Sequence, residues 1–117
     1  SGDTPRERMR ITSDGRGLSE FTAKAWLQFY QTGSQGIRDS HNVSSITDIG
    51  VGETRINFAN NLANADYAAV ASHTIQSSVT NVSDNVTNHA VGNFKISHRE
   101  NGSLIDTSRL AAIVFGS

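Results

Sequence analysis

The chain has 117 residues and a formal net charge of -1, a near-neutral balance that lacks the basic surface expected of a nucleic-acid-binding protein. No apolar run approaches the roughly 20 residues that a membrane-spanning helix needs. The chain contains no cysteine, which excludes disulfides and thiolate metal sites. We therefore expect one small domain, without membrane insertion or a nucleic-acid partner, that gains stability from packing or oligomerisation.

The first 20 residues differ in pattern from the rest of the chain. Residues 6–15 alternate in charge sign, contain few apolar side chains and end at Asp14-Gly15, a turn signal. This segment is too small to bury its own apolar residues. We interpret residues 1–20 as an N-terminal connector or shaft-end segment, and residues 21–117 as the folded domain.

Residues 24–30 give the clearest strand pattern. Ala25, Leu27 and Phe29 fall on one face of a period-two pleat, whereas Trp26 and Tyr30 fall on the other. Similar alternation recurs in three later segments, residues 54–59, 67–74 and 94–99. The pattern predicts strands with one face in the core.

Turn signals and a final apolar segment complete the predicted fold. Residues 50–52 predict a hairpin turn, as does Asn101-Gly102. Weaker strands are predicted around residues 37–38 and 43–47, and Leu62 is expected to plug one end of the core. Residues 110–115 are apolar on both faces, which predicts a central or interface strand. The fold class is all-β, an antiparallel β-sandwich.

The outward face of residues 24–30 is one candidate binding surface. Trp26 and Tyr30 share this face, with Gln28 between them. Aromatic rings stack on the C–H faces of sugars, and an amide hydrogen-bonds to hydroxyls. The alternative is that this face packs against a second sheet or another subunit.

The longest polar stretch, residues 76–92, is predicted to be a loop. Long loops in hairpin-rich domains are often functional, and amide and carboxylate side chains can bind a glycan. The alternative is a solvated connection. The candidate receptor-binding residues here are Asn81, Asp84, Asn85, Asn88 and His89.

No motif predicts catalysis, a cofactor or a metal site. The carboxylates are scattered singly, mostly in turns, where they commonly hydrogen-bond to their own backbone. His41, His73, His89 and His98 lack the paired spacing of metal-binding motifs. A homotrimer could still gather three copies of one histidine on its axis. His98 is expected to be semi-buried because it is in phase with apolar residues.

Several blocks resemble tail fibre and tailspike proteins of tailed bacteriophages. Residues 7–15 (ERMRITSDG) are similar to a connector of these proteins, although the match stops at Gly15. Five further segments resemble a C-terminal module of such fibres. They are residues 25–29 (AWLQF), 42–48 (NVSSITD), 56–58 (INF) and 65–68 (ADYA), and the final apolar strand. The resemblance covers most of the chain but is weak from Thr74 to Asn93.

The resemblance implies a homotrimeric fibre tip that attaches a virion to a bacterium. Its expected partners are further copies of itself, an upstream fibre shaft, and a surface glycan or outer-membrane protein as receptor. It would act on the virion, outside the cell, and not as an enzyme. Two alternatives are a purely structural trimeric fibre segment and a carbohydrate-binding module.

Overall fold

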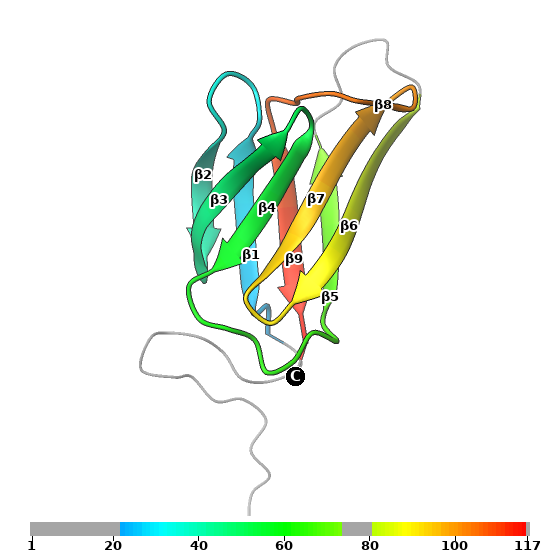
Figure 1. The fold of residues 1–117 in the computed structure, drawn as a ribbon. Coiled ribbons are helices and arrows are strands. Elements are labelled where there is room, and N and C mark those ends of the chain that lie inside the picture. The colour runs from blue at the N-terminus through cyan, green and yellow to red at the C-terminus, as the bar shows by residue number, and fades with distance from the viewer. Residues whose placement is uncertain (1–21, 74–80, 117) are drawn as a thin grey trace, which may run out of the picture.

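The computed structural model describes residues 22–73 and 81–116, which form two antiparallel sheets packed face to face (Figure 1). The first sheet has the order β2-β1-β9-β5, and the second has the order β3-β4-β7-β6, with β8 paired to β7. The strands are β1 (Ala25–Tyr30), β2 (Gly36–His41), β3 (Val43–Gly50), β4 (Glu53–Phe58), β5 (Ala68–His73), β6 (Val82–Ala90), β7 (Asn93–Glu100), β8 (Ser103–Leu104) and β9 (Leu110–Phe115). The described residues contain no helix, so the predicted all-β sandwich is confirmed. The connector predicted for residues 1–20 lies outside the described residues.

The core lies between the sheets and follows the predicted alternation. In β1, Ala25, Leu27 and Phe29 are buried, whereas Trp26 is exposed on the opposite face. β9, next to β1 in the same sheet, adds Leu110, Ala112 and Val114. Strands β4 and β7 of the second sheet supply the facing apolar side chains, which are Ile56, Phe58, Phe94 and Ile96. Leu62 is also buried and belongs to this core, as predicted. The final strand is interior to its sheet, between β1 and β5.

Both predicted hairpin turns are present, and their glycines have identifiable roles. Gly52 joins β3 to β4 with a φ of +71°, and an added Cβ would lie 2.8 Å from the carbonyl oxygen of His98. Asn101 and Gly102 join β7 to β8 with φ values of 53° and 84°. Positive φ at both central residues is the signature of the tight turns that match strand twist.

The prediction of a loop over residues 76–92 is wrong for most of its length. Residues 74–80 lie outside the described part of the chain, but Val82–Ala90 form the nine-residue strand β6, paired with β7. Its partly buried positions include Val82, Asp84 and Val86, and its register shifts between Thr87 and Ala90. A polar residue at the middle inward position and this irregularity hide the period-two pattern in the sequence.

One residue carries the chain from the first sheet to the second. Asn42 lies alone between β2 and β3 and has a φ of 56°. Its side-chain Nδ2 donates to the carbonyl oxygens of Lys24 at 3.0 Å and Asn60 at 3.2 Å, and its Oδ1 accepts from the Asn60 backbone N–H at 2.8 Å. Asn42 therefore ties three segments together at the corner where the sheets meet.

Two substitutions separate the backbone and side-chain roles of Asn42. We expect Asn42→Ala to lower the free energy of unfolding by about 2–4 kcal/mol, because it removes these hydrogen bonds and forces alanine into positive φ. Asn42→Gly loses the same hydrogen bonds but tolerates positive φ, so its loss should be smaller by about 1 kcal/mol. Urea unfolding followed by circular dichroism measures both. Equal losses would contradict the assigned backbone role.

Candidate functional site

A row of apolar side chains crosses the outer face of the first sheet. Trp26 on β1 pairs with Ile113 on β9, and Ile113 pairs on its other side with Val70 on β5. These side chains are 37%, 43% and 63% exposed, and Phe115, farther along β9, is 42% exposed. We call these four residues the apolar row. Contiguous exposed apolar surface is a feature of sites that bind another protein or a ligand, which makes this row a candidate site.

The structure places Trp26 and Tyr30 on the same outer face but near opposite ends of β1. Their backbone positions are four residues apart, which corresponds to about 13 Å along a strand. The guanidinium carbon of Arg38 lies 5.0 Å from the centroid of the Tyr30 ring, and the Tyr30 side chain fills the space above Gly36. A ligand that contacts both aromatic rings must therefore span the region around Gln28.

Four of the five candidate residues predicted from the polar stretch are exposed. Asn81, Asn85, Asn88 and His89 lie in or next to β6 on the exposed surface, although the His89 ring also packs 4.9 Å from that of Tyr67. The prediction of receptor contact does not fit Asp84. Its side chain is only 4% exposed and points between the sheets, because it occupies an inward position of β6.

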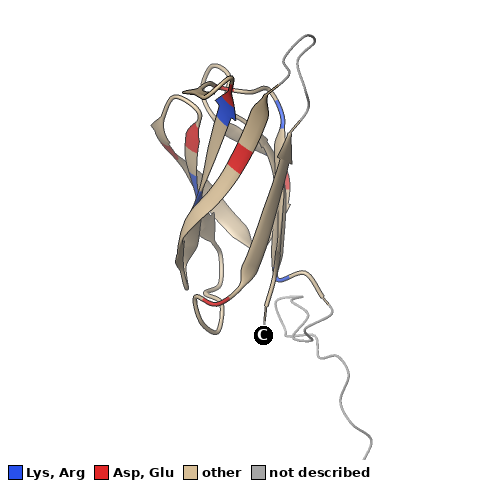
Figure 2. Ribbon diagram, turned by 90° about the vertical axis from the view of Figure 1, so that its right-hand side faces the viewer, with Lys and Arg blue, Asp and Glu red and all other residues tan. Residues whose placement is uncertain are grey.

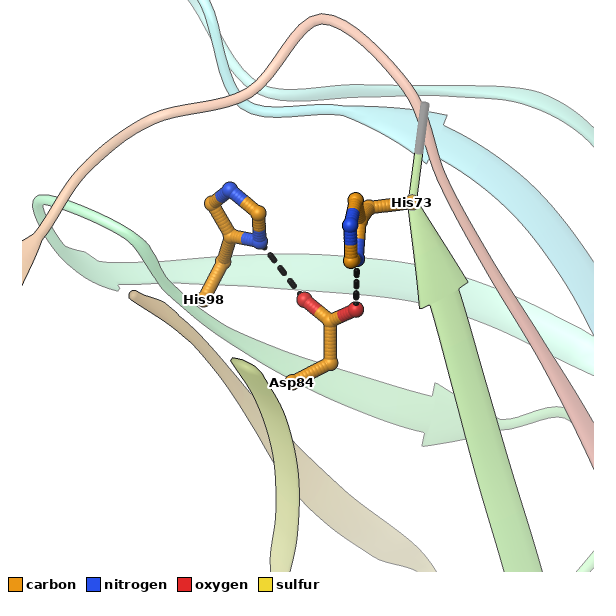
Figure 3. A group of neighbouring side chains, drawn as sticks. All are labelled: His73, Asp84 and His98. Atoms are coloured by element: carbon orange, nitrogen blue, oxygen red, sulfur yellow. Dashed lines mark hydrogen bonds and ion pairs between the residues drawn. The ribbon is translucent and has the colours of Figure 1, made fainter. Parts of the chain in front are cut away.

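Asp84 lies between two histidines from different sheets (Figure 3). Its Oδ2 is hydrogen-bonded to His73 Nδ1 at the end of β5, and its Oδ1 lies 2.6 Å from His98 Nδ1 on β7. On the far side of the His98 ring, Nε2 lies 3.0 Å from Glu100 Oε2. The side chains of His98 and Glu100 are 1% and 11% exposed, and that of His73 is 17% exposed. This arrangement forms a largely buried cluster.

The two strands at this edge of the sandwich carry few charged residues. Strand β5 contains no Lys, Arg, Asp or Glu, and β6 contains only Asp84, as the view toward this edge shows (Figure 2). A carboxylate buried at such a place needs compensation by donors or by a cation, because burial without partners is costly. The two imidazoles supply that compensation in the structure.

The sequence did not predict the cluster because its members come from three strands. Spacing rules for histidines detect ligands on one helix or one loop, whereas His73 and His98 are 25 positions apart in the numbering. The alternation within each strand could nevertheless have indicated that these side chains point inward. Asp84 is in phase with two valines of β6, and His98 and Glu100 continue the inward phase of Phe94. Ionisable residues at successive inward positions are uncommon and therefore point to a paired site.

Comparisons with known protein families, curated proteins and solved structures found no match to this chain. In the part of the chain that the structure describes, no helix is both long enough and apolar enough to cross a membrane. The resemblance to tail fibre modules therefore remains an expectation from the sequence.

Tyr67 anchors the lower end of β6 next to the exposed His89. Its hydroxyl lies 2.9 Å from the carbonyl oxygens of both Ala90 and Asn93, and its ring packs edge-on against Phe58. Burial raises the pKa of the Tyr67 phenol above its ordinary value of 10.0, and the hydrogen bond to Ala90 opposes this shift with a smaller effect. The neutral phenol is therefore the form that the fold favours.

This pKa shift predicts that the contribution of Tyr67 to the free energy of unfolding falls at high pH. Because the folded state holds the phenolic proton to higher pH than the unfolded state, its contribution to stability is complete below pH 10.0 and is lost as pH rises through the folded-state pKa. Tyr67→Phe should remove this alkaline loss and cost about 0.5–1.5 kcal/mol at neutral pH. Urea unfolding across pH, with phenolate absorbance as a second measurement, checks both effects. A phenolate signal from Tyr67 that develops below pH 10.0 would contradict the assignment.

Proposed function

We propose that this chain is the tip domain of a bacteriophage tail fibre, which binds a receptor on the bacterial surface as a homotrimer. The observation that carries the proposal is the apolar row. An otherwise polar chain, with 36% hydrophobic residues, leaves a tryptophan, an isoleucine and a valine side by side on one sheet. Such a face gains free energy when it is covered.

A second copy of the same chain is the occupant that fits this face best. The row crosses the interior strand β9 and both of its neighbours, β1 and the edge strand β5, so it lies away from the edge formed by β2 and β3. Homotypic association lets each copy cover the apolar row of another, and this supplies stability to a small domain without disulfides. The resemblance to fibre modules favours three copies.

The second sheet would supply the receptor surface. Strand β6 belongs to the sheet that does not carry the apolar row, so covering that row leaves Asn81, Asn85, Asn88 and His89 accessible. Amide and imidazole groups form adaptable hydrogen bonds to a glycan or to polar protein surface. Three copies on one fibre would turn weak individual contacts into firm attachment through avidity.

The homotrimer is tested by light scattering on the full chain. The expected solution mass is near three times 12.6 kDa, and Ile113→Lys should lower it because the charge would be buried at the contact. Val91→Lys is the matched control, because Val91 is similarly exposed at 41% but lies outside the apolar row. A monomeric native chain would overturn the homotrimer. A mass unaffected by Ile113→Lys would remove the apolar row as its interface.

Receptor binding is tested by labelling bacterial cells with the fluorescent trimer. We expect Asn85→Ala combined with His89→Ala to weaken cell binding by about tenfold or more, since avidity multiplies a small loss at each of the sites. Ser45→Ala on exposed β3 serves as the control. A folded trimer that labels no isolate of a broad panel would favour the structural fibre segment. A monomer that binds one glycan would favour a carbohydrate-binding module.

A further inference from the structure

We propose that His73, Asp84 and His98 form a zinc-binding site that links the two sheets, with Glu100 as the supporting carboxylate. The potential ligand atoms of the three residues all lie within 4.8 Å of one another. They are supplied by β5 in the first sheet and by β6 and β7 in the second. An ion at this point would join edge strands of both sheets.

The type of ligand selects the class of metal. Two imidazoles and one carboxylate suit Zn²⁺ and other divalent transition ions, whereas Ca²⁺ and Mg²⁺ prefer sets made only of oxygen. Three protein ligands would leave a tetrahedral zinc ion one position for water. The two carboxylates, Asp84 and Glu100, balance the charge of a divalent ion between neutral imidazoles.

Glu100 gives the site the second layer that metal-binding histidines usually have. A histidine that binds a metal through one ring nitrogen commonly donates its other N–H to a carboxylate, which sets the tautomer and orientation of the ring. His98 has this arrangement, since its Nε2 lies 3.0 Å from Glu100 while its Nδ1 faces Asp84 at 2.6 Å. The contact with Glu100 therefore orients the His98 ring so that its Nδ1 faces the place where the ion would bind.

The geometry identifies what the ion would replace. Asp84 is bonded directly to both His73 and His98, so an ion held by these three residues would take the place of those two hydrogen bonds. The contact between His98 Nε2 and Glu100 lies on the other side of the ring and would be kept. His73 is the most exposed of the three ligands, at 17% of its side chain.

Calorimetric titration of the metal-free full chain with Zn²⁺ tests the site. We expect one ion per chain and a higher melting temperature with zinc. His73→Gln should weaken zinc binding by at least about tenfold. It is the least disruptive ligand change, because His73 is the most exposed member. His41→Gln, which removes an imidazole elsewhere, should leave the affinity unchanged.

Glu100→Ala distinguishes a metal site from a purely hydrogen-bonded cluster. It removes no ligand, yet it should weaken zinc binding by roughly 10- to 100-fold because the His98 ring loses its support. Absence of zinc binding to the native chain, or zinc binding that His73→Gln leaves unchanged, would overturn the site. Binding of one ion per three chains would also overturn it, since the ion would then lie between subunits. These readouts do not depend on receptor binding or on the trimer.

Discussion

The crossing at Asn42 is the constraint on which the sandwich depends. A single residue in positive φ turns the chain from β2 into β3, so the first edge of each sheet is held at a fixed separation by the backbone itself. The amide side chain then fastens this corner to Lys24, at the start of β1, and to Asn60, just after β4. The backbone link and these hydrogen bonds thereby hold the strands that carry most of the core face to face, in addition to the packing of their apolar side chains.

The opposite edge has no such backbone link in the described residues and depends on side chains. There β5 faces β6, and their inward residues include the small Ala69 and Ala71 and the polar Asp84, alongside Val82 and Val86. Small side chains bury little apolar area, so packing alone holds this edge weakly. The bonds from Asp84 to His73 and His98 compensate, because charge-assisted hydrogen bonds in a buried place are strong and directional. Within the described residues, the first edge is closed by the backbone at Asn42 and the second by the bonds of Asp84 to the two histidines.

The sequence predicted those features that depend on neighbouring residues. The alternation of residues 24–30 and the turns at Gly52 and at Asn101-Gly102 are local, and the structure confirms them. Strand β6 was missed because its central inward residue is an aspartate, whose partner lies on another strand. Gln31, a polar residue just after β1, is fully buried, where its Nε2 donates to Thr54 Oγ1 at 3.1 Å and its Oε1 accepts from the Thr107 N–H at 3.2 Å. Asp84 and Gln31 are buried because each has a hydrogen-bond partner far away in the sequence. The alternation of apolar and polar residues along one strand does not reveal such partners.

Strand β6 links the edge cluster to the proposed attachment surface. In the described residues this edge strand is paired only with β7, and it is held to the first sheet by the bond from Asp84 to His73 and by the Tyr67 anchor at its lower end. The outward Asn85, by contrast, is exposed, whereas His89 packs against the ring of Tyr67. A substitution at Asn85 can therefore change what the surface binds at small cost in stability, whereas a change at Asp84 would release the strand itself. This separation of inward and outward positions is what an attachment protein needs if its receptor varies between hosts.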